Sequence, residues 1–377
     1  TPTPRREPAR ADTFITSFFL VRHMAKETVE IDISTGMIYT TSIGIGNETR
    51  LVFLPAHAPR MTFENVTQIW LIQEELSRVP GWVVAFPNLE SFALSGPYMT
   101  AITKQDMKIL ERCKSLRDLG FGGNFPGGIP EEISCLQGLD ELTLGASGLT
   151  VLPDSLCDLV HLTKLGLSNN DTSAKHPNHF PEFPAVLLRM KGLRELYITG
   201  VGMERFPAAK KSELVALERL DISRNPIAEL PGWLLPGNAI RRLDLSHTNI
   251  AALPGDIGRW TNLEVLDVSF SSLEALPDAI GGCKRLRELR AAGTKLRAVP
   301  ASIGGCERLE VLDLSGTDVK TLPAELARCD MLKLVRHKHL RPSVVPPAVW
   351  HMKGVRFERD DDRMPVHCPI GDKYDYC

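Results

Sequence analysis

The sequence has few aromatic residues and almost no net charge, so neither property points to a particular function. Aromatic residues make up only 6% of the 377 residues, and the formal net charge at pH 7 is −2. A balance so close to neutrality indicates neither a nucleic acid nor an anionic membrane surface as partner. The hydrophobic share of 43% is typical of a folded protein and excludes a disordered chain.

Long apolar runs are also missing, whereas a transmembrane helix needs about 20 consecutive apolar residues. The run near the N-terminus, Phe14 to Val21, reads FITSFFLV and is less than half that length. No small-residue cleavage pattern follows it, as a secretory signal would require. We therefore expect a strand or helix of an N-terminal cap here, and no membrane insertion.

Motifs that bind nucleotides or metals are missing as well. There is no Walker A loop and no GxGxxG followed by an acidic residue. In RHKHL, His337 takes an inward position of a predicted strand and His339 an outward one, so they lie on opposite faces. In HPNH, His176 and His179 have no nearby cysteine or clustered carboxylate. We predict no catalytic residue, no cofactor and no metal site.

What the sequence does contain is repetition. The stretch LEVLDVSFSSLEALPDAIGGCKRL is nearly copied by LEVLDLSGTDVKTLPAELARCDML, and the first leucine of each segment serves as an anchor. The anchors are Leu116, Leu139 and Leu162, then Leu217, Ile240, Leu263, Leu286, Leu309 and Leu332, with steps of 23 residues in each run. Weaker copies begin at Val66, Leu89, Leu193 and Val355. A fixed period of this kind indicates a stacked array.

Three steps between anchors depart from this period. They span 27 residues from Leu89 to Leu116, 31 from Leu162 to Leu193 and 24 from Leu193 to Leu217. The eight extra residues of the second step imply an insertion, which we place in DTSAKHPNHF, Asp171 to Phe180, after a turn at Asn170. This loop should bulge from the stack, because the repeat phase returns only at Phe183.

Within one unit the residues follow the pattern L-x-x-L-x-L-x-x-N-x-L-x-x-L-P-x-x-I. Leu263, Leu266 and Val268 are the inward residues of one predicted strand, and Leu273 and Leu276 line the ascending side. A single strand and turn cannot bury these side chains, so each unit needs a neighbour above and below it. Stacking would produce a continuous core of leucines.

This pattern resembles that of the leucine-rich repeat proteins over some three quarters of the chain, and segments such as LPDAIG resemble their 23-residue LPxxIG subclass. Similar proteins include intracellular plant proteins, scaffold proteins and bacterial type III effector proteins. The resemblance implies an α/β solenoid, a leucine-rich repeat horseshoe with a parallel concave sheet. Short helices or 3-10 turns would cover its convex side, and a cap would close each end. A fold by itself does not determine a function.

We divide the chain into three parts. Residues 1–64 form an N-terminal cap with a β-hairpin, because Thr28 to Phe53 alternates apolar and polar residues around a turn at 34–36. Residues 65–357 form the array of about twelve units. Residues 358–377 form a C-terminal tail, in which Cys368 and Cys377 either close a disulfide or remain free thiols. Neither part outside the array looks large enough for a separate catalytic domain.

The ninth position of such a unit commonly carries asparagine, whose amide satisfies backbone groups in the turn after the strand. Asparagine stands there at Asn124, Asn170 and Asn225, and a hydroxyl residue at Ser147, Thr248, Ser271, Thr294 and Thr317. We predict a hydrogen-bonded ladder with partial substitutes and no catalytic serine row.

Three cysteines follow the repeat. Cys283, Cys306 and Cys329 each lie three residues before the next anchor. This shared phase predicts small, buried, apolar side chains on the returning side of the array. Reduced thiols suit a cytosolic protein.

Residues that point outward from the predicted strands form columns on the concave face, and we expect these columns to be exposed. One runs Gly120, Thr143, Gly166, Tyr197, Asp221, Asp244, Asp267, Arg290, Asp313, Arg336, and another runs Gly123, Ala146, Asn169, Gly200, Arg224, His247, Phe270, Gly293, Gly316, His339. Arginine and aromatic residues are common anchors of protein interfaces. The candidate partner-binding residues are therefore Tyr197, Asp221, Arg224, Asp244, His247, Asp267, Phe270 and Arg290. The alternative is that aspartate is simply common at this position of such repeats and has no role in binding.

The sequence thus favours a protein–protein interaction module, a monomer without enzymatic activity that binds a protein partner on its concave face. We expect a cytoplasmic protein. This expectation includes a bacterial effector that acts in the cytoplasm of a host cell. One alternative is the substrate-recruiting part of a ubiquitin-ligase-type effector. Another is an extracellular receptor-like binder, which a signal peptide upstream of Thr1 and a glycan on Asn65 would indicate.

Overall fold

The computed structural model describes residues 66–72, 76–96, 98–169, 175–208, 212–234, 239–338 and 345–359, and the backbone of four strands closer to the N-terminus. Two compact units make up the chain, Thr1–Leu139 (unit 1) and Asp140–Cys377 (unit 2). The boundary between them falls inside the array that the sequence predicts as one segment. Each unit is described by itself.

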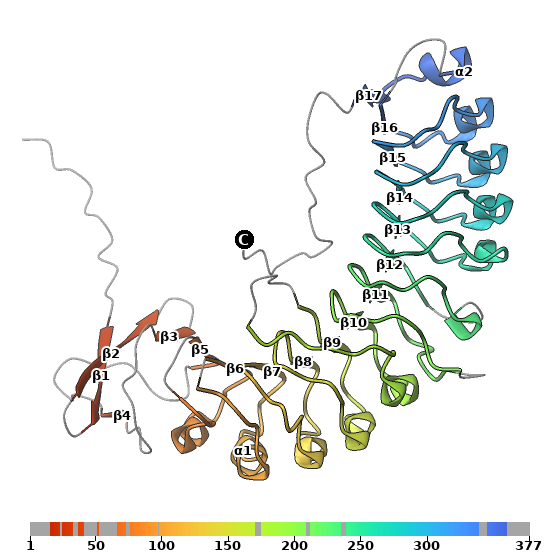
Figure 1. The fold of residues 1–377 in the computed structure, drawn as a ribbon. Coiled ribbons are helices and arrows are strands. Elements are labelled where there is room, and N and C mark those ends of the chain that lie inside the picture. The colour runs from red at the N-terminus through yellow and green to blue at the C-terminus, as the bar shows by residue number, and fades with distance from the viewer. Residues whose placement is uncertain are drawn as a thin grey trace, which may run out of the picture. The chain divides into compact units, whose positions relative to one another are not determined.

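Unit 1 begins with antiparallel strands and continues with parallel ones (Figure 1). Its strands are β1 (Thr16–Arg22), β2 (Ala25–Asp32), β3 (Met37–Thr40), β4 (Leu51–Val52), β5 (Gln68–Ile72), β6 (Ser91–Ser95) and β7 (Asp118–Gly122). β1 pairs antiparallel with β2 and with β4, and β2 pairs antiparallel with β3 on either side of residues 33–36. From β3 through β5 and β6 to β7 the pairing is parallel, as stacked repeats require.

The 27-residue step in unit 1 contains a true α-helix. The helical segments of this unit are η2 (Gly81–Ala85), α1 (Lys104–Leu110) and η3 (Glu131–Cys135), where η marks a 3-10 helix. A capping box starts α1, because the Thr103 hydroxyl accepts from the Asp106 N–H and the Asp106 carboxylate accepts from the Thr103 N–H. The other oxygen of Asp106 accepts from the N–H of Val79 at 2.9 Å, which attaches the helix to the preceding repeat.

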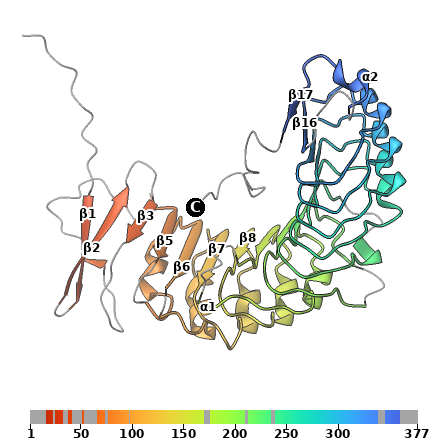
Figure 2. The same cartoon turned by 45° about the horizontal axis from the view of Figure 1, so that its top comes forward.

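Unit 2 is a stack of parallel strands with 3-10 helices opposite them. Its strands are β8 (Glu141–Thr143), β9 (Lys164–Gly166), β10 (Glu195–Tyr197), β11 (Arg219–Asp221), β12 (Arg242–Asp244), β13 (Val265–Asp267), β14 (Glu288–Arg290), β15 (Val311–Leu314), β16 (Leu334–His337) and β17 (Arg356–Glu358). Its helices are η4 (Asp154–Asp158), η5 (Ala185–Arg189), η6 (Gly232–Leu234), η7 (Ile257–Arg259), η8 (Asp278–Gly282), η9 (Ala301–Gly305), η10 (Ala324–Arg328) and α2 (Pro347–Trp350). Figure 2 shows the strands of this unit on the concave side and the helices on the convex side. The predicted α/β solenoid of leucine-rich repeats is confirmed.

The 23-residue spacing places equivalent leucines against one another. Leu266 of β13 pairs in register with Leu243 of β12 and Leu289 of β14, and all three side chains are fully buried. Each inward leucine therefore fills the space between two neighbouring repeats, and one repeat alone could not bury it.

Proline and glycine shape the convex side. Pro277 and Pro300 directly precede η8 and η9, where the fixed φ of proline suits the start of a helical turn. Neighbouring 3-10 helices approach so closely that a Cβ on Gly281 would lie 2.3 Å from the carbonyl oxygen of Ser302. A Cβ on Gly304 would lie 2.3 Å from the carbonyl oxygen of Glu325. The glycine after the isoleucine is therefore a packing requirement of the stack.

The second position of the repeat carries alternating charge across seven neighbouring repeats. These residues are Arg194, Glu218, Arg241, Glu264, Arg287, Glu310 and Lys333. Neighbours form ion pairs, among them Arg194–Glu218 at 2.7 Å, Arg241–Glu264 at 3.0 Å and Arg287–Glu310 at 2.6 Å. Partly exposed pairs of this kind contribute about 0.2–1 kcal/mol each to the free energy of unfolding. A single pair therefore matters little, and only the sum over the row has a sizeable effect on stability.

The three cysteines in repeat phase are buried, as predicted. The thiols of Cys283, Cys306 and Cys329 point to carbonyl oxygens of the preceding repeat at 3.4, 3.3 and 3.6 Å. Burial raises the pKa of Cys283 and Cys306 to about 12 and that of Cys329 to about 11. A thiol held protonated and shielded from water is a poor nucleophile.

We predict that these three thiols react slowly with a maleimide in the folded protein and rapidly in guanidinium chloride. Of the cysteines that the structure describes, Cys135 and Cys157 are half-exposed and should be modified before the three buried ones, which provides an internal control. Peptide mass mapping after short labelling measures the order of modification. Disulfides between the three buried cysteines would contradict a reducing compartment.

Candidate protein-binding site

The turns that follow the strands position the candidate residues, and asparagine holds one such turn together. The Asn225 Oδ1 accepts from the N–H groups of Val201 and Met203, each at 3.0 Å. Its Nδ2 donates to the carbonyl oxygens of Ile198, Ile222 and Ser223. One buried amide thus satisfies five backbone groups of two neighbouring repeats, as the predicted ladder requires.

In the repeat that begins at Leu162, the ladder position belongs to Asn178 and not to Asn170. The Asn178 Oδ1 accepts from Ser147 and Leu149 N–H at 3.0 and 2.9 Å, and its Nδ2 donates to the carbonyls of Leu144 and Leu167. Our placement of the insertion was therefore wrong, since the eight extra residues are 170–177 and precede the ladder asparagine. Asn170 itself lies outside the described residues. Aligning N-H-F at 178–180 with the N-x-L of the repeat would have revealed this.

Asn169 closes the base of the insertion. Its Oδ1 accepts from the Asn178 N–H at 2.8 Å, and its Nδ2 donates to the carbonyl oxygens of Asn178 and Gly200, also at 2.8 Å. Asn169 is buried and occupied by these bonds, so it offers nothing to a partner.

The other ladder positions form fewer hydrogen bonds than an asparagine would form there. Thr248, Thr294 and Thr317 each donate one hydrogen bond to a carbonyl oxygen of their own repeat. The prediction is wrong for Asn124, whose half-exposed side chain forms no hydrogen bond with the described residues. In that repeat the buried ring of Phe125 follows directly and fills the turn.

The first predicted column is in register on the concave face of unit 2. Tyr197 pairs with Asp221, Asp221 with Asp244, Asp244 with Asp267 and Asp267 with Arg290. The structure therefore brings these five candidate residues together on neighbouring strands, β10 to β14.

Tyr197 is held in place by its neighbours. Its hydroxyl donates to Glu195 Oε2 at 2.7 Å and accepts from Arg219 Nη1 at 2.8 Å. The Lys164 ammonium lies 6.0 Å from the centre of the ring. Burial, followed by the hydrogen bond to Glu195, raises the pKa of Tyr197. Glu195 and Arg219 lie on the same face as Tyr197, two positions before the first column in their repeats, and our sequence analysis missed them.

The expectation that this column is exposed is wrong for Asp244 and Asp267, which are only 8% and 4% exposed. Each carboxylate turns back toward its own chain and accepts from the backbone N–H two residues on, at 2.9 Å in both cases. Short acidic side chains readily form such local turns. These aspartates thus help to shape the end of the strand, whatever their part in binding.

Ion pairs are distributed unevenly along this column. Arg290 lies 3.8 Å from Asp267 and 2.6 Å from Glu288, and Arg336 lies 3.3 Å from Asp313. Asp244 has no such cation among the described residues. Burial, followed by the carboxylates of Asp221 and Asp267, raises the pKa of Asp244 well above its ordinary value of 3.8.

The raised pKa makes unit 2 less stable when Asp244 ionises. A carboxyl group whose pKa is higher in the folded than in the unfolded chain contributes stability below the unfolded pKa, and loses it as the pH rises through the folded pKa. We expect Asp244→Asn, which keeps an oxygen for the Ser246 N–H, to raise the melting temperature by a few degrees at pH 7 and not at pH 4. The facing charges of Asp221, Asp267 and Arg242 are the same in both proteins. Identical shifts at the two pH values in thermal unfolding would contradict the raised pKa.

The second predicted column adopts an unusual backbone conformation. Arg224, His247 and Phe270 each have a φ of 56°, in the left-handed region that side chains other than glycine rarely enter. Their counterparts in the repeats before and after are Gly200 and Gly293, with φ of 65° and 66°. A left-handed residue with a Cβ costs roughly 1–2 kcal/mol, and three neighbouring repeats bear this cost.

These three side chains are exposed, as predicted. The rings of His247 and Phe270 stack with centroids 4.8 Å apart and planes 15° apart. Phe270 lies over the next repeat, because a Cβ on Gly293 would come within 2.6 Å of its ring. Glycine at position 293 is therefore what lets Phe270 lie flat.

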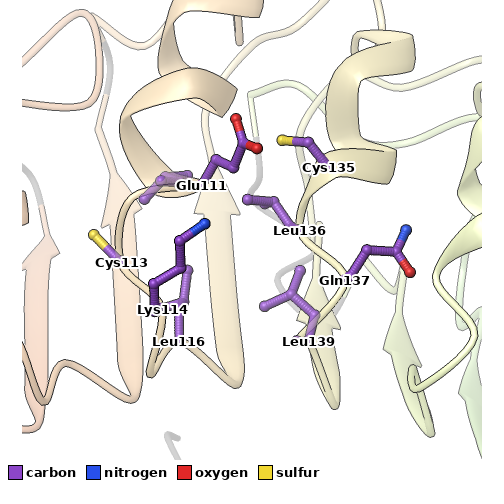
Figure 3. Close-up of a pocket in the computed structure, with 10 residues that line it drawn as sticks. Glu111, Cys113, Lys114, Leu116, Cys135, Leu136, Gln137 and Leu139 are labelled. Carbon is purple, nitrogen blue, oxygen red and sulfur yellow. The ribbon is translucent and has the colours of Figure 1, made fainter.

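Outside this face, a hollow of about 140 Å³ in unit 1 lies between α1 and η3 (Figure 3). Cys113 and Cys135 line it, together with Glu111. Burial raises the pKa of both thiols, and the Glu111 carboxylate raises that of Cys135 further. Neither cysteine is prepared to act as a nucleophile.

No group of side chains suited to a metal ion occurs in the described part of the chain. His337 is fully buried, with its Nε2 at 2.9 Å from the Val319 carbonyl oxygen, and His339 lies outside the described residues. Nor does any helix in the described ranges have the length and apolar character to cross a bilayer.

Comparisons with known proteins identify the fold. No protein-family model matches the sequence, and no curated protein matches it. A leucine-rich repeat protein of Leptospira interrogans is similar in structure, with a TM-score of 0.57 and 23% identity over 78% of this chain and 73% of that one. An internalin of Listeria monocytogenes gives 0.53 and 15% over 78% and 87%, and Toll in the Drosophila Toll–Spatzle complex gives 0.51 and 18% over 75% and 46%. The chain has the leucine-rich repeat fold.

Proposed function

We propose that this protein is a binding module without enzymatic activity, and that it holds a protein partner on the concave face of unit 2. The observation that carries the proposal is the run of Arg224, His247 and Phe270, three bulky and exposed side chains in a backbone conformation that favours glycine. Strain of this kind persists where a side chain serves a purpose other than the fold. Tyr197 and Arg290 flank the run on the same face.

Several features support a protein as the partner. Arginine and aromatic residues are the side chains that most often dominate binding energy at protein interfaces. A standard interface needs about 800 Å² from each side, which several adjacent repeats could supply together. Toll, which has the same fold, was observed in a complex with Spatzle, and we extend such a binding role to this chain as part of the proposal.

The finer identity is also a proposal. We favour a monomeric cytoplasmic protein of the LPxxIG subclass, including an effector that acts in a host cell, because the buried cysteines are unpaired. A substrate-recruiting part of a ubiquitin ligase would show ubiquitin transfer by the full-length product. An extracellular binder would carry a signal peptide and a glycan on Asn65.

The test compares capture of partners by the native chain and by the double variant Arg224→Ala/Phe270→Ala, using lysates of candidate host cells and mass spectrometry. We expect the principal partner to bind the variant at least about 2 kcal/mol more weakly, roughly 30-fold. The melting temperature should be nearly unchanged, since neither side chain contributes to the core.

The competing site is the insertion at 170–177. A chain without these eight residues should still bind the partner, because Asn169 can then connect directly to Asn178. Loss of binding in this deletion, together with normal binding by the double variant, would show that the partner docks on the insertion instead.

A further inference from the structure

The side chains on the concave face also indicate which chemistry the partner presents. We infer that the turn stripe, defined as Arg224, His247 and Phe270, binds an extended segment of a partner protein that carries an acidic side chain close to an aromatic one. The inference rests on the proposed function and specifies the partner of the same site. It depends on three properties of the stripe, namely its accessible charge, its apolar surface and its length.

The accessible charge of this region is positive. The guanidinium group of Arg224 is exposed and forms no ion pair or hydrogen bond with the described residues. Arg219 and Arg242 are half-exposed on the same face, at the first residues of β11 and β12. An arginine without a partner offers a planar pair of donors that matches a carboxylate.

The acidic residues beside the stripe are largely withdrawn from a partner. Asp244 and Asp267 are buried, and their carboxylates accept from backbone N–H groups. Asp267 also faces the Arg290 guanidinium at 3.8 Å. Of the three aspartates, only Asp221 is half-exposed, and its Oδ1 is occupied by the N–H and hydroxyl of Ser223 at 3.0 and 2.6 Å. Glu195 and Glu288 on the same face are also half-exposed, and they accept from the Tyr197 hydroxyl at 2.7 Å and from Arg290 at 2.6 Å. A cationic partner would therefore meet arginine before it met a carboxylate.

The other end of the stripe is apolar and has open space beside it. Phe270 is 40% exposed, and one of its faces is covered by the stacked ring of His247. The Phe270 ring itself lies over Gly293, and in the repeat after that the same position is Gly316, which has no side chain. An aromatic side chain of a partner could lie over Gly316 and against the edge of Phe270, in the offset or edge-on arrangements that aromatic pairs prefer.

The length of the stripe sets the spacing of the partner's residues. Neighbouring strands lie about 4.8 Å apart, so Arg224 and Phe270, two repeats apart, are separated by roughly 10 Å. An extended chain advances about 3.3 Å per residue. An acidic residue and an aromatic residue two to four positions apart would reach both ends of the stripe.

The probe is a phage library of random 12-residue peptides, panned against the full chain. We expect the selected peptides to combine Asp or Glu with Phe, Tyr or Trp at that spacing. The best peptide is then synthesised, together with a copy in which amides replace its carboxylates, and affinities are measured by fluorescence anisotropy. We expect the amide copy to bind at least tenfold more weakly.

Glycine variants connect the peptide to the stripe without risking the fold. Arg224→Gly and Phe270→Gly should each weaken the peptide at least tenfold and raise the melting temperature, because glycine relieves the left-handed strain. The matched controls are Arg194→Ala and Val160→Ala, an exposed arginine and an exposed apolar residue away from the stripe. Both controls should bind the peptide as the native chain does.

Two outcomes would overturn the inference. Selected peptides rich in Lys or Arg, whose binding is lost in Asp221→Asn, would show a cationic partner and would leave the concave-face proposal intact. Acidic peptides whose binding is insensitive to every substitution on this face would show that the acidic segment docks elsewhere. Insensitivity would count against the concave-face proposal as well.

Discussion

Replacing Asn178 with alanine is expected to destabilise unit 2 by about 3–4 kcal/mol, because each buried polar group left without a partner costs roughly 1–3 kcal/mol. The substitution removes the acceptor of two backbone N–H groups and the donor to two carbonyl oxygens. The backbone of residue 178 would still bond to Asn169, and the His176 carbonyl oxygen would still accept from the Gly148 N–H. Urea unfolding followed by tryptophan fluorescence measures the loss, since Trp260 is buried in the same unit.

The chain offers matched controls for this prediction. Asn225→Ala removes an amide that also accepts from two N–H groups and donates to carbonyl oxygens, three in place of two, and it should cost a similar amount. Asn124→Ala removes an asparagine at the same repeat position whose side chain has no hydrogen bond among the described residues, and should change stability little. A small effect at Asn178 with a large one at Asn225 would show that the insertion has another register.

Replacing Leu266 with alanine is expected to destabilise unit 2 by about 2–5 kcal/mol, the range for removing a large buried aliphatic side chain. Leu266 is fully buried between Leu243 and Leu289 of the neighbouring strands. Because repeats are stabilised chiefly by contacts with their neighbours, a cavity there weakens two interfaces at once. The free energy of unfolding in urea is again the measurement.

Val160→Ala is the control for Leu266→Ala, since it removes apolar atoms from a side chain that is 64% exposed. It should change the free energy of unfolding by less than about 0.5 kcal/mol. Asp267→Ala is informative in a different way. From the sequence alone it would be harmless, but the buried carboxylate and its bond to Ser269 now imply a measurable loss. Comparable losses at Val160 and Leu266 would contradict the register of the array.

The fold could be predicted from the sequence because period and packing have the same cause. An inward leucine such as Leu266 must meet its equivalent in the next repeat, so the spacing of 23 residues appears directly in the chain. Proline before the 3-10 helices and the buried phase of Cys306 follow from the same stacking. The register of the first outward column, from Tyr197 to Arg290, also followed from the spacing.

The details that could not be predicted depend on hydrogen bonds and backbone angles. Counting from the anchor selected Asn170 for the ladder, because a loop can be inserted on either side of a turn without changing the total. Alternation along a strand marked Asp244 as exposed, but it does not show a carboxylate folding back onto its own chain. The left-handed angle of Phe270 was also invisible, although Gly200, Gly293 and Gly316 at the same position were a usable signal.

The alternating charges from Arg194 to Lys333 have a consequence for how such an array can change in length. Loss of one repeat, such as the 23 residues from Leu263 to Arg285, would set Arg241 beside Arg287. Loss of the 46 residues from Ile240 to Arg285 would set Glu218 beside Arg287 and keep opposite charges adjacent. Insertion of repeats obeys the same parity. Gain or loss of a pair of repeats therefore keeps opposite charges adjacent along this row. Gain or loss of an odd number of repeats would place like charges side by side, and one of them would then have to be replaced by a residue of opposite charge.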